Sequence, residues 1–230
     1  MTHICVIFER TNSSLMLLSS YQSLICNLPY LDQAFETRRE TWQRREYEKH
    51  RAFSIFCDKV FENGLLILSR RDLFLSAERG FQEGLFSIIL WGYYRNMRGN
   101  SFLKILTSIP KIEKLLSVQR QLNADQFMDL CKQLERSGMG LSTLSKVLYF
   151  FRFTIDGKNC LIMDKRIVDV INGRSFFELS AIGKITDFNK SRNYLVYLTE
   201  MEEIAKANQY KPDQLELFLF LFGKNLKAEL

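Results

Sequence analysis

Two closely spaced glycines stand out as residues whose type and spacing suit a chemical role. Gly138 and Gly140 are separated by Met139 and lie between two predicted amphipathic helices. Glycines in such a turn permit a positive φ and leave backbone amides uncovered. At the start of the second helix, unpaired N–H groups and the helix dipole would favour a phosphate oxygen. The turn therefore suits either a plain interhelical connection or a grip on a DNA strand that does not read its bases.

A lysine and an aspartate follow the glycine turn. Lys146 lies four residues after Ser142, so the two share one face of the predicted helix 141–153, away from its apolar stripe. Asp164 comes directly after an apolar run, Leu161–Met163, at the start of the next predicted helix. Lys146 is either a functional amine or a solvated, phosphate-pairing lysine. Asp164 is at least a candidate helix N-cap, because its side-chain oxygen can accept a backbone N–H.

These segments resemble a known family of DNA repair enzymes. Residues 138–151 and 161–168 resemble the helix-hairpin-helix motif and the catalytic-aspartate segment of the base-excision DNA glycosylases. The similarity is greatest to the bacterial group related to 8-oxoguanine DNA glycosylase. Residues 90–100 and 212–223 are also similar to segments of that group, so that the resemblance covers about residues 85–223.

The resemblance implies both a fold and a reaction. The fold is mainly α, a two-lobed helical bundle with a helix-hairpin-helix DNA-binding motif. Duplex DNA would lie across the lobes with a damaged base flipped out of the stack. In this family a lysine amine attacks the sugar C1′, displaces the base and forms a Schiff base, while a carboxylate stabilises positive charge on the sugar. Bifunctional members then cut the strand.

One position departs from the family pattern. The nucleophilic lysine usually comes two residues after the second glycine, and here that residue is Ser142. Lys146 lies one helical turn of about 5.4 Å later, and a helical side chain leans back toward the helix N-terminus. We therefore assign Lys146 as the nucleophile, Asp164 as the charge-stabilising carboxylate and Ser142 as a helix-start residue.

The expected DNA contacts come from the hairpin and from a basic loop. They are Gly138, Met139, Gly140, Ser142, Thr143, Arg95 and Arg98. The two arginines either contact phosphate or are merely solvated. The neighbouring aromatics Trp91, Tyr93 and Tyr94 suit stacking on a base, although core packing is favoured for Trp91.

The composition favours a folded helical protein of the cytoplasm. Apolar residues make up 47% of the 230-residue chain, and only three prolines interrupt it. The net charge of +6 is compatible with a nucleic-acid partner without proving one. Five scattered cysteines without a Cys-x-x-Cys pair indicate neither disulfides nor zinc. The most apolar run, residues 85–91, is too short to cross a membrane, and no signal peptide is expected.

No metal is predicted, because His3 and His50 have no partners at ligand spacing. No cofactor is expected either, except that the resemblance allows a monovalent cation held by hairpin carbonyls. We divide the chain into an N-terminal helical extension of unknown role, 1–80, and a glycosylase-like domain, 81–230. The predicted helices are 13–25, 36–68, 71–91, 101–107, 110–118, 127–136, 141–153, 164–171, 191–208 and 212–223.

Three functions remain open from the sequence. The first is a monomeric, nucleoid-associated DNA glycosylase, with or without lyase activity, that excises an oxidised purine from double-stranded DNA. The second is a non-enzymatic helix-hairpin-helix DNA-binding protein that has lost the nucleophile, an alternative that Ser142 supports. The third is an all-helical interaction protein in which the glycines form only a turn.

Overall fold

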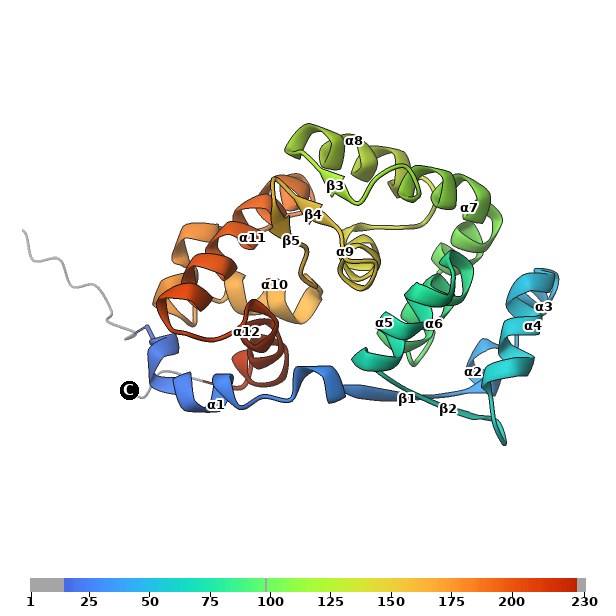
Figure 1. Cartoon of the computed structure of the whole chain (residues 1–230), viewed down its shortest axis with the longest axis horizontal. Helices are drawn as coiled ribbons and strands as arrows, with labels where there is room; N and C mark the ends of the chain where they lie inside the picture. Colours follow the sequence, from blue (N-terminus) through green and yellow to red (C-terminus); the bar gives the residue numbers. More distant parts are fainter. Residues whose placement is uncertain (1–14, 98, 227–230) are drawn as a thin grey trace, which may run out of the picture.

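The computed structural model describes residues 15–97 and 99–226, and it confirms a mainly α fold. The helices form two groups with α8 and α9 between them (Figure 1). The first group contains α2 (Arg39–Trp42), α3 (Arg45–Glu48), α4 (Arg51–Val60), α5 (Arg70–Arg79), α6 (Phe81–Gly92) and α7 (Ser101–Leu116). The second contains α1 (Gln22–Cys26), α10 (Lys165–Asn172), α11 (Lys190–Ala207) and α12 (Pro212–Phe218). The middle pair is α8 (Ala124–Glu135) and α9 (Leu141–Phe150).

Short 3-10 and π turns and five short strands complete the fold. The turns are η1 (Leu18–Tyr21), η2 (Tyr30–Asp32), η3 (Phe177–Ile182) and η4 (Leu219–Gly223). The strands are β1 (Ala34–Arg38), β2 (Leu65–Ser69), β3 (Gln121–Leu122), β4 (Thr154–Ile155) and β5 (Lys158–Asn159). In the described residues no helix is long and apolar enough to span a membrane.

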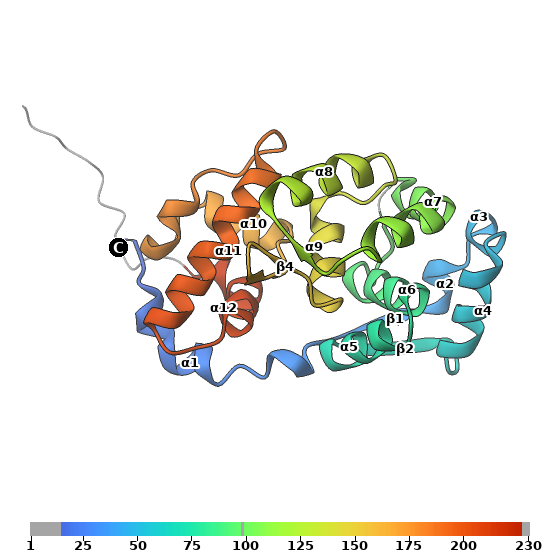
Figure 2. The same cartoon turned by 45° about the horizontal axis from the view of Figure 1, so that its top comes forward.

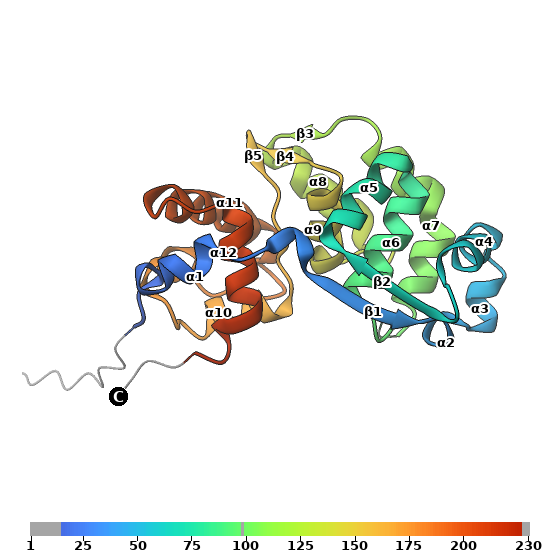
Figure 3. The same ribbon diagram turned by 60° about the horizontal axis from the view of Figure 1, so that its bottom comes forward.

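The long helix predicted over residues 36–68 is wrong at both of its ends. β1 and β2 pair antiparallel there, from Ala34 opposite Ser69 to Arg38 opposite Leu65 (Figure 3). Phe35 and Thr37 alternate with exposed residues along β1, which is the two-residue period of a strand with one covered face. Phe35 packs on Trp91 of α6 with ring centroids 5.2 Å apart. Trp42, Tyr47, Phe53 and Phe56, whose spacing is similar to that of one long helix, lie in the separate helices α2, α3 and α4.

Two other helix boundaries differ from the sequence prediction. The predicted helix 71–91 is broken at Gly80, whose extended backbone separates α5 from α6. Ser69 caps α5, which begins at Arg70, and Asp72 completes a capping box with it. Conversely, the helices predicted at 101–107 and 110–118 are one helix, α7, with Pro110 inside it. Its buried stripe, from Phe102 to Leu116, runs on without a break and favours a single helix.

Capping residues determine where two further helices begin. α8 begins at Ala124, earlier than the predicted start at residue 127, because Asn123 caps it. The Asn123 side chain accepts from the Gln126 amide at 2.9 Å, and the Gln126 side chain reaches back to the Asn123 amide. Pro212 is the first residue of α12, where its missing N–H carries no penalty. The helix predicted near 13–25 is represented by η1 and α1, and residues 13–14 lie outside the described range.

One continuous core joins the two groups of helices, and α9 is at its centre (Figure 2). Nine of its ten residues are buried, all except Ser142. A helix that is covered on almost every side can hold a polar side chain in a fixed position. Residues 16–26 pack on the rest of the second group, where the Leu18 amide donates to Glu178 Oε1 at 2.8 Å. Asp32 and Gln33 accept from Arg71 and Arg70 of α5 in the first group. The division of the chain at residue 80 stays a prediction.

Candidate active site

Lys146 is a buried lysine in the middle of α9, with 4% of its surface exposed. It is therefore not the solvated lysine that the sequence left open. Its Nζ donates to Ser142 Oγ at 3.1 Å and to the Ser142 carbonyl oxygen at 3.2 Å. The amine also lies over the ring of Tyr93, 5.5 Å from the centroid. The side chain thus leans back one turn to the position of Ser142.

Gly92, the last residue of α6, provides the space for this lysine. A Cβ added at Gly92 would lie 2.9 Å from Lys146 Cδ and 3.1 Å from Cε. Both distances are shorter than an ordinary van der Waals contact. Any larger residue at the end of α6 would therefore displace the lysine stem.

Asp164 caps α10 and still keeps one oxygen free of that task. Its Oδ1 accepts from the amides of Arg166 at 2.9 Å and Ile167 at 3.2 Å. Across residues 15–97 and 99–226 its Oδ2 has no hydrogen-bond partner, and the side chain is half-buried. The capping role and a second role toward a bound group are therefore compatible.

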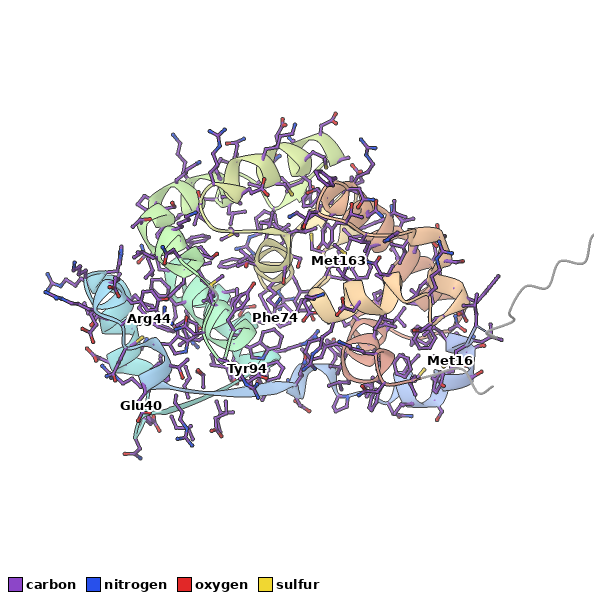
Figure 4. The ribbon with its side chains drawn as sticks, turned by 180° about the vertical axis from the view of Figure 1, so that it is seen from behind. Met16, Glu40, Arg44, Phe74, Tyr94 and Met163 are labelled. Atoms are coloured by element: carbon purple, nitrogen blue, oxygen red, sulfur yellow. The ribbon has the colours of Figure 1, made fainter. Side chains whose placement is uncertain are left out.

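A cavity of about 180 Å³ brings Lys146 and Asp164 together. It lies where both groups of helices meet α9, so that segments far apart in the sequence form its wall. Figure 4 labels Tyr94, which belongs to this wall, and Met163, which directly precedes Asp164. Its aromatic lining is Phe35, Trp91, Tyr94 and Phe220, and its other polar lining is Gln33, Arg70, Arg166 and Glu216. A larger cavity of about 420 Å³ contains neither Lys146 nor Asp164.

A buried ion pair supports one wall of this cavity. The two terminal nitrogens of Arg70 donate to the two carboxylate oxygens of Glu216 at 2.8 and 2.9 Å. Burial alone would lower the pKa of Arg70, but the Glu216 carboxylate more than compensates and raises it. Arg70 also lies over the rings of Trp91 and Tyr149, 5.8 and 5.5 Å from their centroids. The guanidinium therefore stays charged and fixed.

Removing one partner of this pair should be strongly destabilising. Glu216→Gln leaves the buried Arg70 charge without its counter-ion, and we expect the free energy of unfolding to fall by about 3–5 kcal/mol. The free energy of unfolding should fall clearly less in the double variant Arg70→Met/Glu216→Leu, because no buried charge remains. Urea unfolding of the three proteins measures this difference. A double variant less stable than Glu216→Gln would contradict the prediction.

The glycine turn connects α8 to α9, and its two glycines differ. Gly138 has a φ of +79°, and a Cβ there would lie 2.4 Å from the Ser101 carbonyl oxygen. Gly140 caps α9 with a φ of −70°, and nothing lies within 4 Å of its Cβ position. The expectation that both glycines serve a positive φ is therefore wrong for Gly140. Within the described segments, the amides of Gly140, Leu141 and Ser142 have no hydrogen-bond partner.

The two glycines should respond differently to alanine. Gly138→Ala requires a left-handed alanine and a shift of Ser101, so we expect a loss of about 1–3 kcal/mol in stability. Gly140→Ala should change stability by less than about 0.5 kcal/mol, because neither φ nor space opposes it. Thermal unfolding of both variants tests this contrast. Equal melting temperatures would show that the turn relaxes at no cost.

A family comparison now adds to this geometry. The model of the family described as "Putative 8-oxoguanine DNA glycosylase OGG-like protein" matches residues 29–220. The chain belongs to this family. No curated protein and no solved structure matches it. The family match begins upstream of Gln33, so it includes cavity residues of the N-terminal third that the sequence resemblance did not reach.

The remaining residues of the expected DNA-binding set lie in different environments. Met139 and Thr143 are buried, and the Thr143 hydroxyl lies 2.6 Å from the Tyr93 hydroxyl. The Met139 amide donates to the Leu134 carbonyl and the Thr143 amide to the Gly140 carbonyl, so neither backbone amide is free for a phosphate. Arg95 is exposed and lies over the Tyr94 ring. Arg98 lies outside the described residues.

Sequence reasoning did not single out the polar lining of the cavity. The missed residues are Gln33, Arg70, Arg166 and Glu216. Glu216 gave one usable signal, because it is the only charged residue in the apolar run 215–222. A carboxylate on an otherwise apolar helix predicts a buried cationic partner.

Proposed function

We propose that this protein is a DNA glycosylase that removes an oxidised purine, of the 8-oxoguanine type, from duplex DNA. The observation that carries the proposal is the cavity in which Lys146 and Asp164 lie together among aromatic side chains. A base flipped out of the duplex would stack on those rings, with its sugar toward the lysine and the aspartate. Membership of the glycosylase-like family supports the same activity.

The environment of Lys146 suits an attacking amine. The two Ser142 oxygens accept from Nζ and hold the nitrogen in one direction. An amine attacks C1′ in its neutral form, through the lone pair that its hydrogen bonds leave free. Ser142, at the family's usual lysine position, becomes the residue that orients the amine.

The reaction follows from this arrangement. The Lys146 Nζ forms a bond to C1′ as the bond from C1′ to the base nitrogen breaks, and the base leaves with that electron pair and takes up a proton. Positive charge develops on the sugar, and the free Oδ2 of Asp164 stabilises it. Ring opening gives a Schiff base between Lys146 and the sugar. For the lyase step, water or the departed base would remove the C2′ proton of that Schiff base, a C2′–C3′ double bond would form, and the 3′ phosphate would leave with the electrons of the C3′–O bond.

The α8–α9 turn is proposed to hold the DNA backbone. The amides of Gly140, Leu141 and Ser142 at the start of α9 suit one phosphate group. Gly140→Val should keep the fold, since its Cβ position is open, but cover these amides. We expect affinity for duplex DNA to fall roughly three- to tenfold, equally for all sequences. Fluorescence anisotropy measures this, and a loss confined to one sequence would contradict backbone binding.

Borohydride trapping tests the proposed activity. The protein is incubated with duplexes that carry 8-oxoguanine, 8-oxoadenine, uracil or undamaged guanine, and the reductant converts any Schiff base into a stable adduct. We expect a covalent adduct and base release with an oxidised purine and none with undamaged guanine. DNA binding without base release on every duplex would instead support the non-enzymatic DNA-binding alternative.

A further inference from the structure

Two buried side-chain nitrogens of the cavity residues have no partner in the described residues. They are the Nε2 of Gln33 and the Nε1 of Trp91, and neither has a hydrogen-bond acceptor in the described part of the chain. Both residues line the cavity that contains Lys146 and Asp164. Buried donors are almost always hydrogen-bonded in folded proteins. Two orphan donors around one cavity therefore indicate a ligand that supplies acceptors.

The hydrogen bond of the Gln33 amide oxygen fixes the orientation of the amide. Its Oε1 accepts from Arg70 Nε at 2.6 Å, so the amide cannot turn its oxygen toward the cavity without losing that bond. Arg70 is itself held by both oxygens of Glu216. The buried ion pair thus determines that Gln33 presents a donor.

The orientation of Trp91 is fixed by packing. Its ring lies edge-on to Phe150 at 5.5 Å and tilted against Phe35 at 5.2 Å, with Arg70 over its face. Only 4% of its surface is exposed. A tryptophan nitrogen can donate but never accept, so a group that bonds to Trp91 Nε1 has to be an acceptor.

We propose that Gln33 and Trp91 are the specificity-determining residues for the base, and that they select a base whose edge carries carbonyl oxygens. This inference rests on the proposed glycosylase function. A guanine-derived oxidised base offers a carbonyl at C6, whereas an adenine-derived one carries an amino group there, which would leave a donor facing a donor. Arg70 and Glu216 are positioning residues that act through Gln33.

Single-turnover base release from 8-oxoguanine and 8-oxoadenine duplexes tests this assignment. Trp91→Phe removes the donor and keeps an aromatic ring. Gln33→Met removes the donor with little change in length, and it also removes the acceptor of Arg70 Nε. Each variant should release 8-oxoguanine about five- to a hundredfold more slowly, because its carbonyl loses a buried partner. Release of 8-oxoadenine should change less, so that discrimination between the two bases shrinks.

Two controls separate recognition from structure. Trp42→Phe also removes a buried indole donor, but that N–H bonds to Thr37 Oγ1 at 2.9 Å and lies outside the cavity lining, so discrimination should be unchanged. Affinity for a duplex with a tetrahydrofuran abasic analogue, which has no base, should be the same for Trp91→Phe and wild type.

The outcomes distinguish the role of Gln33 and Trp91 from the proposed glycosylase activity. Wild type without release of either base would refute the glycosylase function. An active wild type whose discrimination is unchanged in both Trp91→Phe and Gln33→Met would overturn the assignment of these residues alone. If the rate of base release fell equally for both bases, or if affinity for the abasic-analogue duplex fell as well, the residues would have a structural role and the assignment would be overturned.

Discussion

Lys146→Gln is expected to abolish borohydride trapping and to slow base release by at least about a thousandfold. Glutamine has no amine nucleophile, yet its length and polarity suit the Ser142 oxygens that hold Lys146. Affinity for an abasic-analogue duplex should fall only a few-fold, since at most one phosphate contact is lost. Trapping yield and single-turnover rates measure the first two effects, and anisotropy measures the third.

Lys165→Gln is the matched control for this variant. Lys165 directly follows Asp164, but its side chain is 85% exposed and pairs with Asp169 on the surface. Trapping should be unchanged there. If Lys146→Gln instead retains base release while trapping is lost, water is the attacking group in glycosidic cleavage and Lys146 acts only afterwards. Retention of both would remove Lys146 from the reaction.

Asp164→Asn is expected to separate catalysis from folding. Asparagine is as good an N-cap as aspartate, so α10 should keep its bonds to the amides of Arg166 and Ile167. Stability should change by less than about 0.5 kcal/mol. Base release should fall roughly a hundred- to a thousandfold, because the negative charge that stabilises the developing sugar cation is gone.

Asp164→Ala provides the comparison, since it removes both the charge and the cap. We expect the same loss of base release together with a loss of about 1 kcal/mol in the free energy of unfolding. Urea unfolding and single-turnover assays on both variants give the two quantities. Full activity in Asp164→Asn would mean that the carboxylate serves α10 alone.

Local signals in the sequence predicted the local parts of this site. The four-residue spacing of Ser142 and Lys146 placed both on one helix face, and the structure adds their hydrogen bonds. Asp164 after an apolar run predicted the start of α10. These features depend on residues close together in the chain, where helix geometry determines the outcome.

The nonlocal parts could not be obtained in the same way. Gln33, Arg70 and Glu216 meet only after strands and helices from both ends of the chain have packed. β1 was missed because its alternation spans only Ala34–Arg38 and is followed at once by helical steps. Short segments of this kind are decided by their tertiary partners, here β2 and α6.

The packing of residues 16–26 on the rest of the second group of helices has a consequence for the order of folding. Gln22 donates to the Asn208 carbonyl across 186 residues of sequence, and Gln214 donates to the Cys26 carbonyl across 188. Such contacts close very long loops, so they form late and slow the approach to the native state. The cavity wall likewise draws on both ends, from Gln33 to Phe220. A nascent chain still on the ribosome would therefore carry the Lys146 amine without the complete cavity around it. The capacity to accept a flipped base would arise only when synthesis had passed α12.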